Sequence, residues 1–206
     1  MRTLMLLVGG LAVALIGSSA GAAPIINGDV PIGEYATVLH DVAGETYAGN
    51  LDIETFQFDA SNAYYNVALT VTAPPLDKTG GVTSPMRQTE FWATFYDAAG
   101  TTPSYYVDVL MNAGGVLAFN LVDMATGSLV PLAAGDYSVS AANGLEFRID
   151  KAKMPLLAAT PYVWAQLDNR GAAPDDQISG AVPEPATLAL LATGMVAALI
   201  ARRRRK

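Results

Sequence analysis

The side chains of this sequence that are best suited to chemistry are carboxylates in loops near glycine. Asp41, Glu45 and Asp52 form one group, and Asp175 with Asp176 forms a second group much later in the chain. Calcium binds about six to eight oxygen ligands, chiefly carboxylates and carbonyls, so these loops need no other residue type to hold it. Neither group has the spacing of an EF-hand loop. Two interpretations, a calcium site and solvated loop carboxylates, therefore stay open.

Catalytic chemistry has little support in the composition. The chain has one histidine and no cysteine, which excludes thiol chemistry and cysteine-ligated zinc. His40 lies next to Asp41, but neighbouring side chains on a strand point to opposite faces, and no Gly-x-Ser-x-Gly serine is present. A glycosidase would need two carboxylates facing each other, and the sequence singles out no such pair. We therefore expect no enzyme activity and no cofactor other than calcium.

A third group consists of aromatic side chains that could form a flat platform for sugar rings. Its members are Tyr64, Trp92, Tyr96, Tyr105, Tyr106 and Trp164. Aromatic rings on strands usually pack into a core, because they favour half-buried pleated surfaces. Buried rings would indicate a structural role, and rings gathered on one exposed face would favour carbohydrate binding.

The elements that must position these residues are β-strands. Apolar Tyr65, Val67, Leu69 and Val71 alternate with smaller or polar residues, and this period of two is typical of a half-buried strand. Further runs of this kind are separated by turn signals, and they cover residues 35–40, 51–58, 91–96, 105–111, 116–122, 137–140, 145–149 and 162–166. Eight or nine short strands with this spacing predict an all-β fold, an antiparallel β-sandwich ectodomain.

The first 22 residues have the layout of a signal peptide. A short basic start with Arg2 precedes the apolar run 4–16, and small residues follow at Ala20 and Ala22. This order predicts a signal-peptide helix over residues 1–22 that signal peptidase removes after Ala22. The remainder of the chain would then lie outside the cytoplasmic membrane.

The middle of the chain divides into a domain and a predicted linker. Residues 23–170 contain the strand pattern, and residues 171–182 are rich in Gly, Ala, Pro and Asp, which predicts a flexible linker. Between residues 23 and 182 the chain has six basic and eighteen acidic side chains, a net charge of −12. A field of this sign repels nucleic acid, so we expect no nucleic-acid partner.

Residues 183–206 combine three features in a fixed order. The tripeptide Pro183, Glu184 and Pro185 comes first, and residues 186–201 follow without a charge. The basic cluster 202–206 comes last and consists of Arg202, Arg203, Arg204, Arg205 and Lys206. A helix over 186–201 would be about 24 Å long, which allows a transmembrane span in a thinned bilayer with snorkelling arginines. The positive-inside rule places the basic cluster in the cytoplasm.

The tripeptide, apolar segment and basic cluster resemble the PEP-CTERM sorting signal of Gram-negative bacteria. This resemblance implies recognition of the tail by an exosortase, a membrane transpeptidase, and an association with exopolysaccharide and biofilm. The protein would be anchored in the membrane at least transiently and would finally lie at the cell surface or in the extracellular matrix. We therefore predict an exported, non-catalytic envelope or matrix protein.

The domain itself has a resemblance of its own. Asp41-x-x-Gly44-Glu45, Leu51-Asp52-Ile53, the run 145–149 and the Asp175-Asp176 pair are similar to the motif order of DOMON-like and related carbohydrate-binding β-sandwiches. Such families bind sugars, haem or calcium. The haem-binding members use Met and His as ligands. His40 has no evident partner ligand, so we do not infer haem binding from this resemblance. The alternative function is therefore a carbohydrate-binding module with a calcium-stabilised fold.

Overall fold

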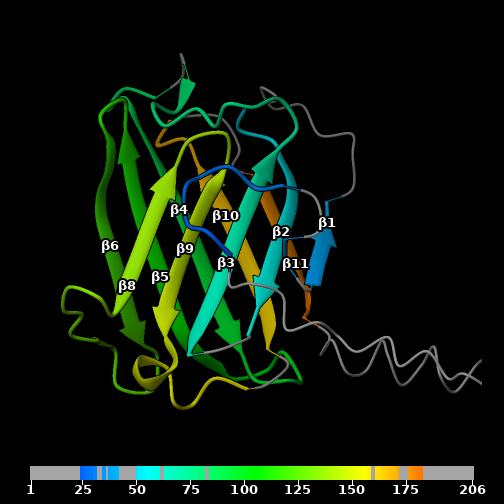
Figure 1. Ribbon diagram of the computed structural model, residues 1–206, viewed down its shortest axis with the longest axis vertical. Coiled ribbons are helices and arrows are strands. Elements are labelled where there is room, and N and C mark those ends of the chain that lie inside the picture. Colours follow the sequence, from blue (N-terminus) through cyan, green and yellow to red (C-terminus); the bar gives the residue numbers. More distant parts are fainter. Residues whose placement is uncertain are drawn as a thin grey trace, which may run out of the picture.

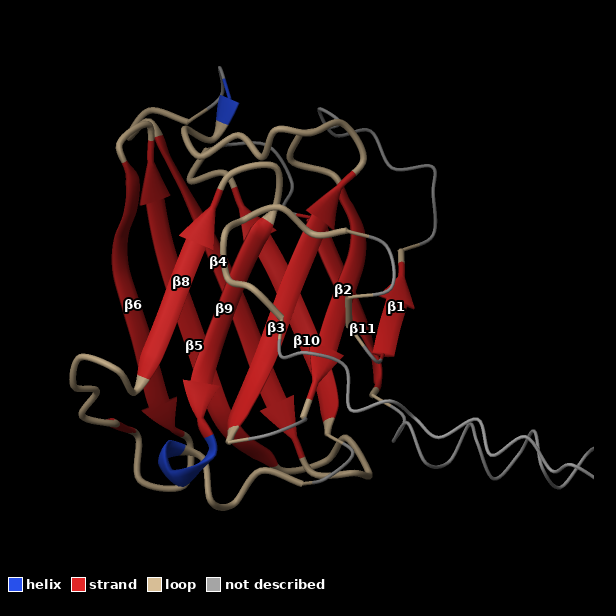
Figure 2. Ribbon diagram, viewed as in Figure 1, coloured by secondary structure: helices blue, strands red, loops and turns tan. Residues whose placement is uncertain are grey.

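The computed structural model describes residues 24–31, 34–35, 37–41, 50–60, 63–81, 84–158, 161–171 and 176–182. Two antiparallel sheets pack face to face, as Figures 1 and 2 show. The predicted all-β antiparallel sandwich is therefore confirmed. The short 3-10 helix η2 (Lys151–Lys153) directly follows β9. The predicted helices over residues 1–22 and 186–201 lie outside the described residues.

The five-stranded sheet has the order β1-β2-β3-β9-β8. Its strands are β1 (Thr37–His40), β2 (Ile53–Asp59), β3 (Tyr64–Val71), β8 (Tyr137–Ala141) and β9 (Leu145–Asp150). The six-stranded sheet has the order β11-β10-β4-β5-β6-β7. Its strands are β4 (Gln88–Tyr96), β5 (Pro103–Asn112), β6 (Gly115–Asp123), β7 (Ser128–Leu129), β10 (Tyr162–Asp168) and β11 (Asp176–Ala181).

Alternation along the strands sends one set of side chains into a single core between the sheets. Aromatic contacts cross from one sheet to the other. The ring centroids of Phe58 and Phe95 are 6.2 Å apart, and those of Phe91 and Phe147 are 6.0 Å apart. These four side chains are at most 3% exposed. Because the chain has no cysteine, burial of this apolar surface is the main force that holds the sheets together.

Strand β11 corrects one prediction from the sequence. Residues 171–182 were expected to form a flexible linker, but Asp176–Ala181 pair with β10 along the whole strand. Ile178 is 5% exposed and Val182 is 2% exposed, so both belong to the core. The small residues of this segment have low β-propensity, and packing against β10, β1 and β2 overrides it. The folded domain therefore extends to Val182.

The segment before β1 crosses the outer face of the five-stranded sheet, where Figure 1 draws it in dark blue in front of β9. Its anchor is Glu146 of β9, whose side chain is fully buried. Glu146 accepts hydrogen bonds from the backbone N–H groups of Asn27 and Gly28 and from the Tyr35 hydroxyl. Gly28 has φ +80, and a Cβ there would come within 2.6 Å of the Ala142 nitrogen, so this close approach requires glycine.

Candidate functional site

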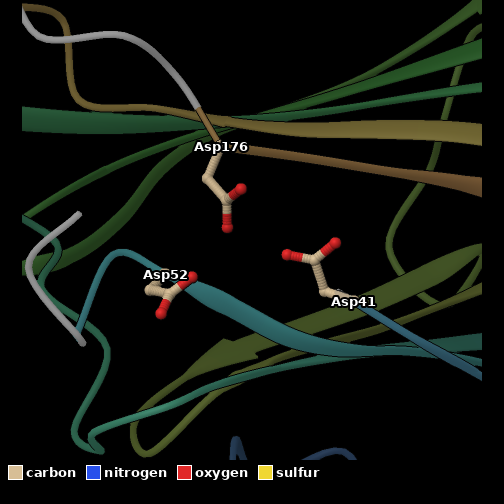
Figure 3. Close-up of side chains that lie close together, drawn as sticks. All are labelled: Asp41, Asp52 and Asp176. Carbon is tan, nitrogen blue, oxygen red and sulfur yellow. The ribbon is translucent and has the colours of Figure 1, made fainter. Parts of the chain in front are cut away.

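Three of the predicted calcium ligands meet at one edge of the sandwich. Asp41 directly follows β1, Asp52 directly precedes β2, and Asp176 is the first residue of β11. One carboxylate oxygen from each lies within 4.8 Å of the others. Figure 3 shows the three side chains pointing toward one another from separate segments. Asp41 and Asp52 are half-buried, and Asp176 is only 1% exposed.

The topology explains why residues so distant in sequence converge. Strands β1 and β11 are the edge strands on the same side of the two sheets, and they contact each other. Strands β1 and β2 are antiparallel, so the end of β1 lies beside the start of β2, and the Asp41 N–H donates to the Glu54 carbonyl at 3.0 Å. Asp176 then reaches across from the other sheet. The carboxylate cluster therefore links the two sheets at their shared edge.

The cluster is partly held by hydrogen-bond donors. The Asp176 carboxylate accepts from the backbone N–H groups of Ile53 and Gln177, and the Thr72 hydroxyl donates to Asp52 Oδ2 at 3.0 Å. Three like charges at this separation repel one another, and a proton or a bound cation relieves that repulsion. An all-oxygen set of this kind suits a hard cation such as calcium.

The other predicted site residues lie outside the described residues. They are Glu45 and Asp175 of the calcium prediction, Ala20 and Ala22 of the signal-cleavage prediction, and Pro183, Glu184, Pro185, Arg202, Arg203, Arg204 and Arg205 of the sorting signal. Thr72 was not predicted. It lies one residue after β3, and only the pairing of its N–H with the Asp52 carbonyl brings it to the cluster.

A second candidate surface is the outer face of the six-stranded sheet. On β4 the buried residues Phe91, Ala93 and Phe95 alternate with side chains that point away from the core. The cross-strand register carries this outer face onto β5 and β10. Five half-buried aromatic rings lie on it: Trp92, Tyr96, Tyr106, Tyr162 and Trp164.

The six aromatic rings predicted to form a platform therefore do not all lie on one surface. Tyr105 is 2% exposed and belongs to the core, and Tyr64 lies on the other sheet with the Arg148 guanidinium 4.8 Å from its ring centroid. Tyr162 was missed by the sequence interpretation, although it follows the same alternation as Trp164. The four other predicted rings share the outer face of the six-stranded sheet.

Polar groups lie among these rings. Glu90 Oε2 is 3.0 Å from Arg170 Nε, and Asn120 donates to Asp108 at 3.0 Å. Burial raises the pKa of Glu90, and the hydrogen bond and negative charge of Asp108 raise it further. Burial and the neighbouring Asp108 and Glu90 charges raise the pKa of Tyr106 to about 12. The face thus offers carboxylates, an amide and a hydroxyl next to aromatic rings.

A groove of about 440 Å³ lies at the opposite edge of the sandwich, between β6 and β8. Phe119 and Tyr137 stack there with their centroids 4.7 Å apart. The residues that line it carry no charged side chain. It therefore offers fewer groups that could orient a polar ligand than the outer aromatic face.

Comparison with protein families gives one match, the PEP-CTERM protein-sorting motif, over residues 181–206. No curated protein and no solved structure matches the chain. Among the described residues, no helix is long and apolar enough to cross a membrane. The matched residues begin at the end of β11 and include the Pro-Glu-Pro tripeptide, the apolar segment and the basic cluster. The family match agrees with the resemblance that the same residues show in the sequence: the chain carries a PEP-CTERM sorting motif over residues 181–206, and this motif implies export and recognition by an exosortase.

Proposed function

We propose that this protein is a non-catalytic component of the cell envelope or extracellular matrix that works in association with exopolysaccharide. The observation that carries the proposal is the sorting motif over residues 181–206. The motif implies export of the domain, and the resemblance of the tail to PEP-CTERM signals implies an association with exopolysaccharide.

The sorting part of this proposal predicts a defined effect of the tripeptide. Replacing Pro183, Glu184 and Pro185 together with alanine should leave export intact but trap the full-length chain in the membrane fraction. Processing should fall by about tenfold or more, because the enzyme loses its recognition element. Immunoblotting of membrane and extracellular fractions measures this, with the exposed-residue variant Met86→Ala as control. Unchanged processing of the alanine variant would show that the tripeptide is incidental.

The second candidate function is carbohydrate binding by the outer face of the six-stranded sheet. The observation that favours it is the gathering of Trp92, Tyr106 and Trp164 on that face with Glu90 and Asp108 among them. Aromatic rings can stack against the apolar faces of sugar rings, and the polar side chains can bond hydroxyl groups. The net charge of −12 between residues 23 and 182 disfavours acidic polymers. We therefore propose a neutral glycan as the ligand.

This function predicts that Trp164→Ala weakens binding to a neutral glycan by about tenfold, since truncating an aromatic anchor typically costs more than 1 kcal/mol. Affinity electrophoresis in gels that contain either neutral β-glucan or a uronic-acid polymer measures the retardation. Tyr64→Ala is the matched control, because Tyr64 is an aromatic residue on the other sheet. Equal retardation of wild type and Trp164→Ala, or binding to the acidic polymer alone, would contradict the assignment.

A calcium-stabilised fold belongs to this second candidate. Its support is the convergence of Asp41, Asp52 and Asp176 across the two sheets. A cation held there stabilises the folded state by RT ln(1 + [L]/Kd), which is about 1.4 kcal/mol at ten times Kd. Residues 23–182 should then melt roughly 3–5 °C higher with calcium than with chelator.

The measurement is a thermal melt at matched ionic strength, with wild type and Asp41→Asn compared. Asp41→Asn should lose the calcium response and lessen the repulsion within the cluster. Magnesium at the same concentration distinguishes a site from general charge screening. Equal melting temperatures with calcium and chelator would contradict the calcium site.

A further inference from the structure

The sorting motif begins where the folded domain ends, with no linker between them. Val182 is 2% exposed, and its N–H donates to the Pro161 carbonyl at 2.9 Å. Pro183, the first residue of the tripeptide, is the next residue in the chain. The matched motif itself starts at Ala181, which is the last residue of β11.

The space available to the sorting enzyme is correspondingly small. Four peptide units separate Val182 from residue 186, where the predicted span begins. A fully extended chain of that length covers about 13 Å. An enzyme that acts at the tripeptide must therefore work between the folded edge of the domain and the bilayer. A flexible linker would have removed this constraint.

Strand β11 is the element whose release would open this space. It is an edge strand, paired with β10 alone. On its inner side Gly180 packs so closely against Leu39 of β1 that a Cβ would come within 3.1 Å of the leucine side chain. The Asp176 carboxylate accepts the Ile53 N–H of β2. Edge elements of this kind open locally at a lower free-energy cost than central strands.

We propose that the exosortase acts on a state of this protein in which β11, from Gln177 onward, has separated from β10. An enzyme that cleaves a backbone binds its substrate as an extended chain outside regular structure. Only Val182 separates the end of β11 from the tripeptide, so β10 and the enzyme compete for the same stretch of backbone. The strand β11 thereby sets the rate at which the motif is processed. This inference rests on the proposed sorting function.

A disulfide between β10 and β11 tests the inference, because the chain has no cysteine of its own. Gln166 and Gln177 face each other in the register. Opposite residues in an antiparallel pair alternate between hydrogen-bonded and non-hydrogen-bonded positions. Because the Val182 N–H donates to the Pro161 carbonyl, residues 161 and 182 form a hydrogen-bonded pair, and counting along the register makes 166–177 a non-hydrogen-bonded pair. The Cα atoms of such a pair are about 4.5 Å apart. That separation suits a disulfide. The test variant is the full-length double substitution Gln166→Cys and Gln177→Cys, and each single substitution is a control.

In cells that contain an exosortase, the oxidised double variant should be processed at least about tenfold more slowly than wild type. Reduction with dithiothreitol should restore the rate, and the single variants should behave like wild type. Processing of the oxidised variant at the wild-type rate would overturn the inference. If the tripeptide alanine variant were also processed normally, the proposed sorting function itself would fail, so the two failures are distinguishable.

A second variant covers the case in which the disulfide disturbs folding. Insertion of about eight Gly and Ser residues between Val182 and Pro183 gives the enzyme a free chain while β11 stays paired. The insertion should speed processing of the wild-type domain several-fold. In a chain with the insertion, the 166–177 disulfide should no longer slow processing. If the insertion left the processing rate of the wild-type domain unchanged, the inference would be overturned independently of the disulfide.

Discussion

Replacing Glu146 with alanine is expected to lower the free energy of unfolding of residues 23–182 by about 3 kcal/mol. The Glu146 carboxylate is fully buried and accepts three hydrogen bonds, two from backbone N–H groups and one from Tyr35. Alanine would leave these donors without their acceptor in a buried site. Burial, followed by the Glu146 charge, raises the pKa of the Tyr35 hydroxyl well above its usual range, so Tyr35 stays a donor.

Urea unfolding followed by tryptophan fluorescence measures this loss. Tyr35→Phe removes one of the three hydrogen bonds and should cost about 1 kcal/mol. Glu54→Ala is the matched control, because Glu54 is an exposed glutamate on β2 and its loss should change stability by less than about 0.5 kcal/mol. A Glu146→Ala variant as stable as Glu54→Ala would show that the segment before β1 contributes nothing to folding.

Removing β11 is expected to have an effect of similar or larger size. A chain that ends at Gly171 keeps every strand of the originally predicted domain but loses Ile178 and Val182 from the core. Burial of two such side chains contributes about 1.5–3 kcal/mol each, and β10 also loses its only neighbour on that side. We expect residues 23–171 to be at least about 4 kcal/mol less stable than residues 23–182.

Thermal and urea unfolding of the two chains give the comparison. A third chain that ends at Gly180 isolates Ala181 and Val182 and should fall between them, because only Val182 of that pair is buried. If residues 23–171 unfolded at the same urea concentration as residues 23–182, the segment after Gly171 would be a linker after all.

The strands that the sequence predicted are those with strong alternation of large apolar side chains. Tyr65 to Val71 and Phe91 to Tyr96 are examples, and the structure places both as central strands with one face in the core. In such strands the local pattern and the global burial agree, so the pattern alone suffices. The all-β antiparallel class follows from these strands and their turns.

The parts that the sequence did not predict depend on contacts between distant residues. Strand β11 consists mostly of small or polar residues, and its extended conformation depends on backbone pairing with β10. Glu146 resembles any surface carboxylate until the segment before β1 covers it. The carboxylates Asp41, Asp52 and Asp176 were each selected from the sequence, but their distances depend on how the two sheets meet at their edge.

The central claim, that an exosortase sorts this protein through residues 181–206, is tested most directly by expressing the full chain in matched cells with and without an exosortase. The account predicts that only cells with the enzyme yield a shorter form that has lost the tail and has left the cytoplasmic membrane fraction. Mass spectrometry of that form should place its new C-terminus at or beside the tripeptide. A chain of the same size and distribution in both cell types would contradict the account.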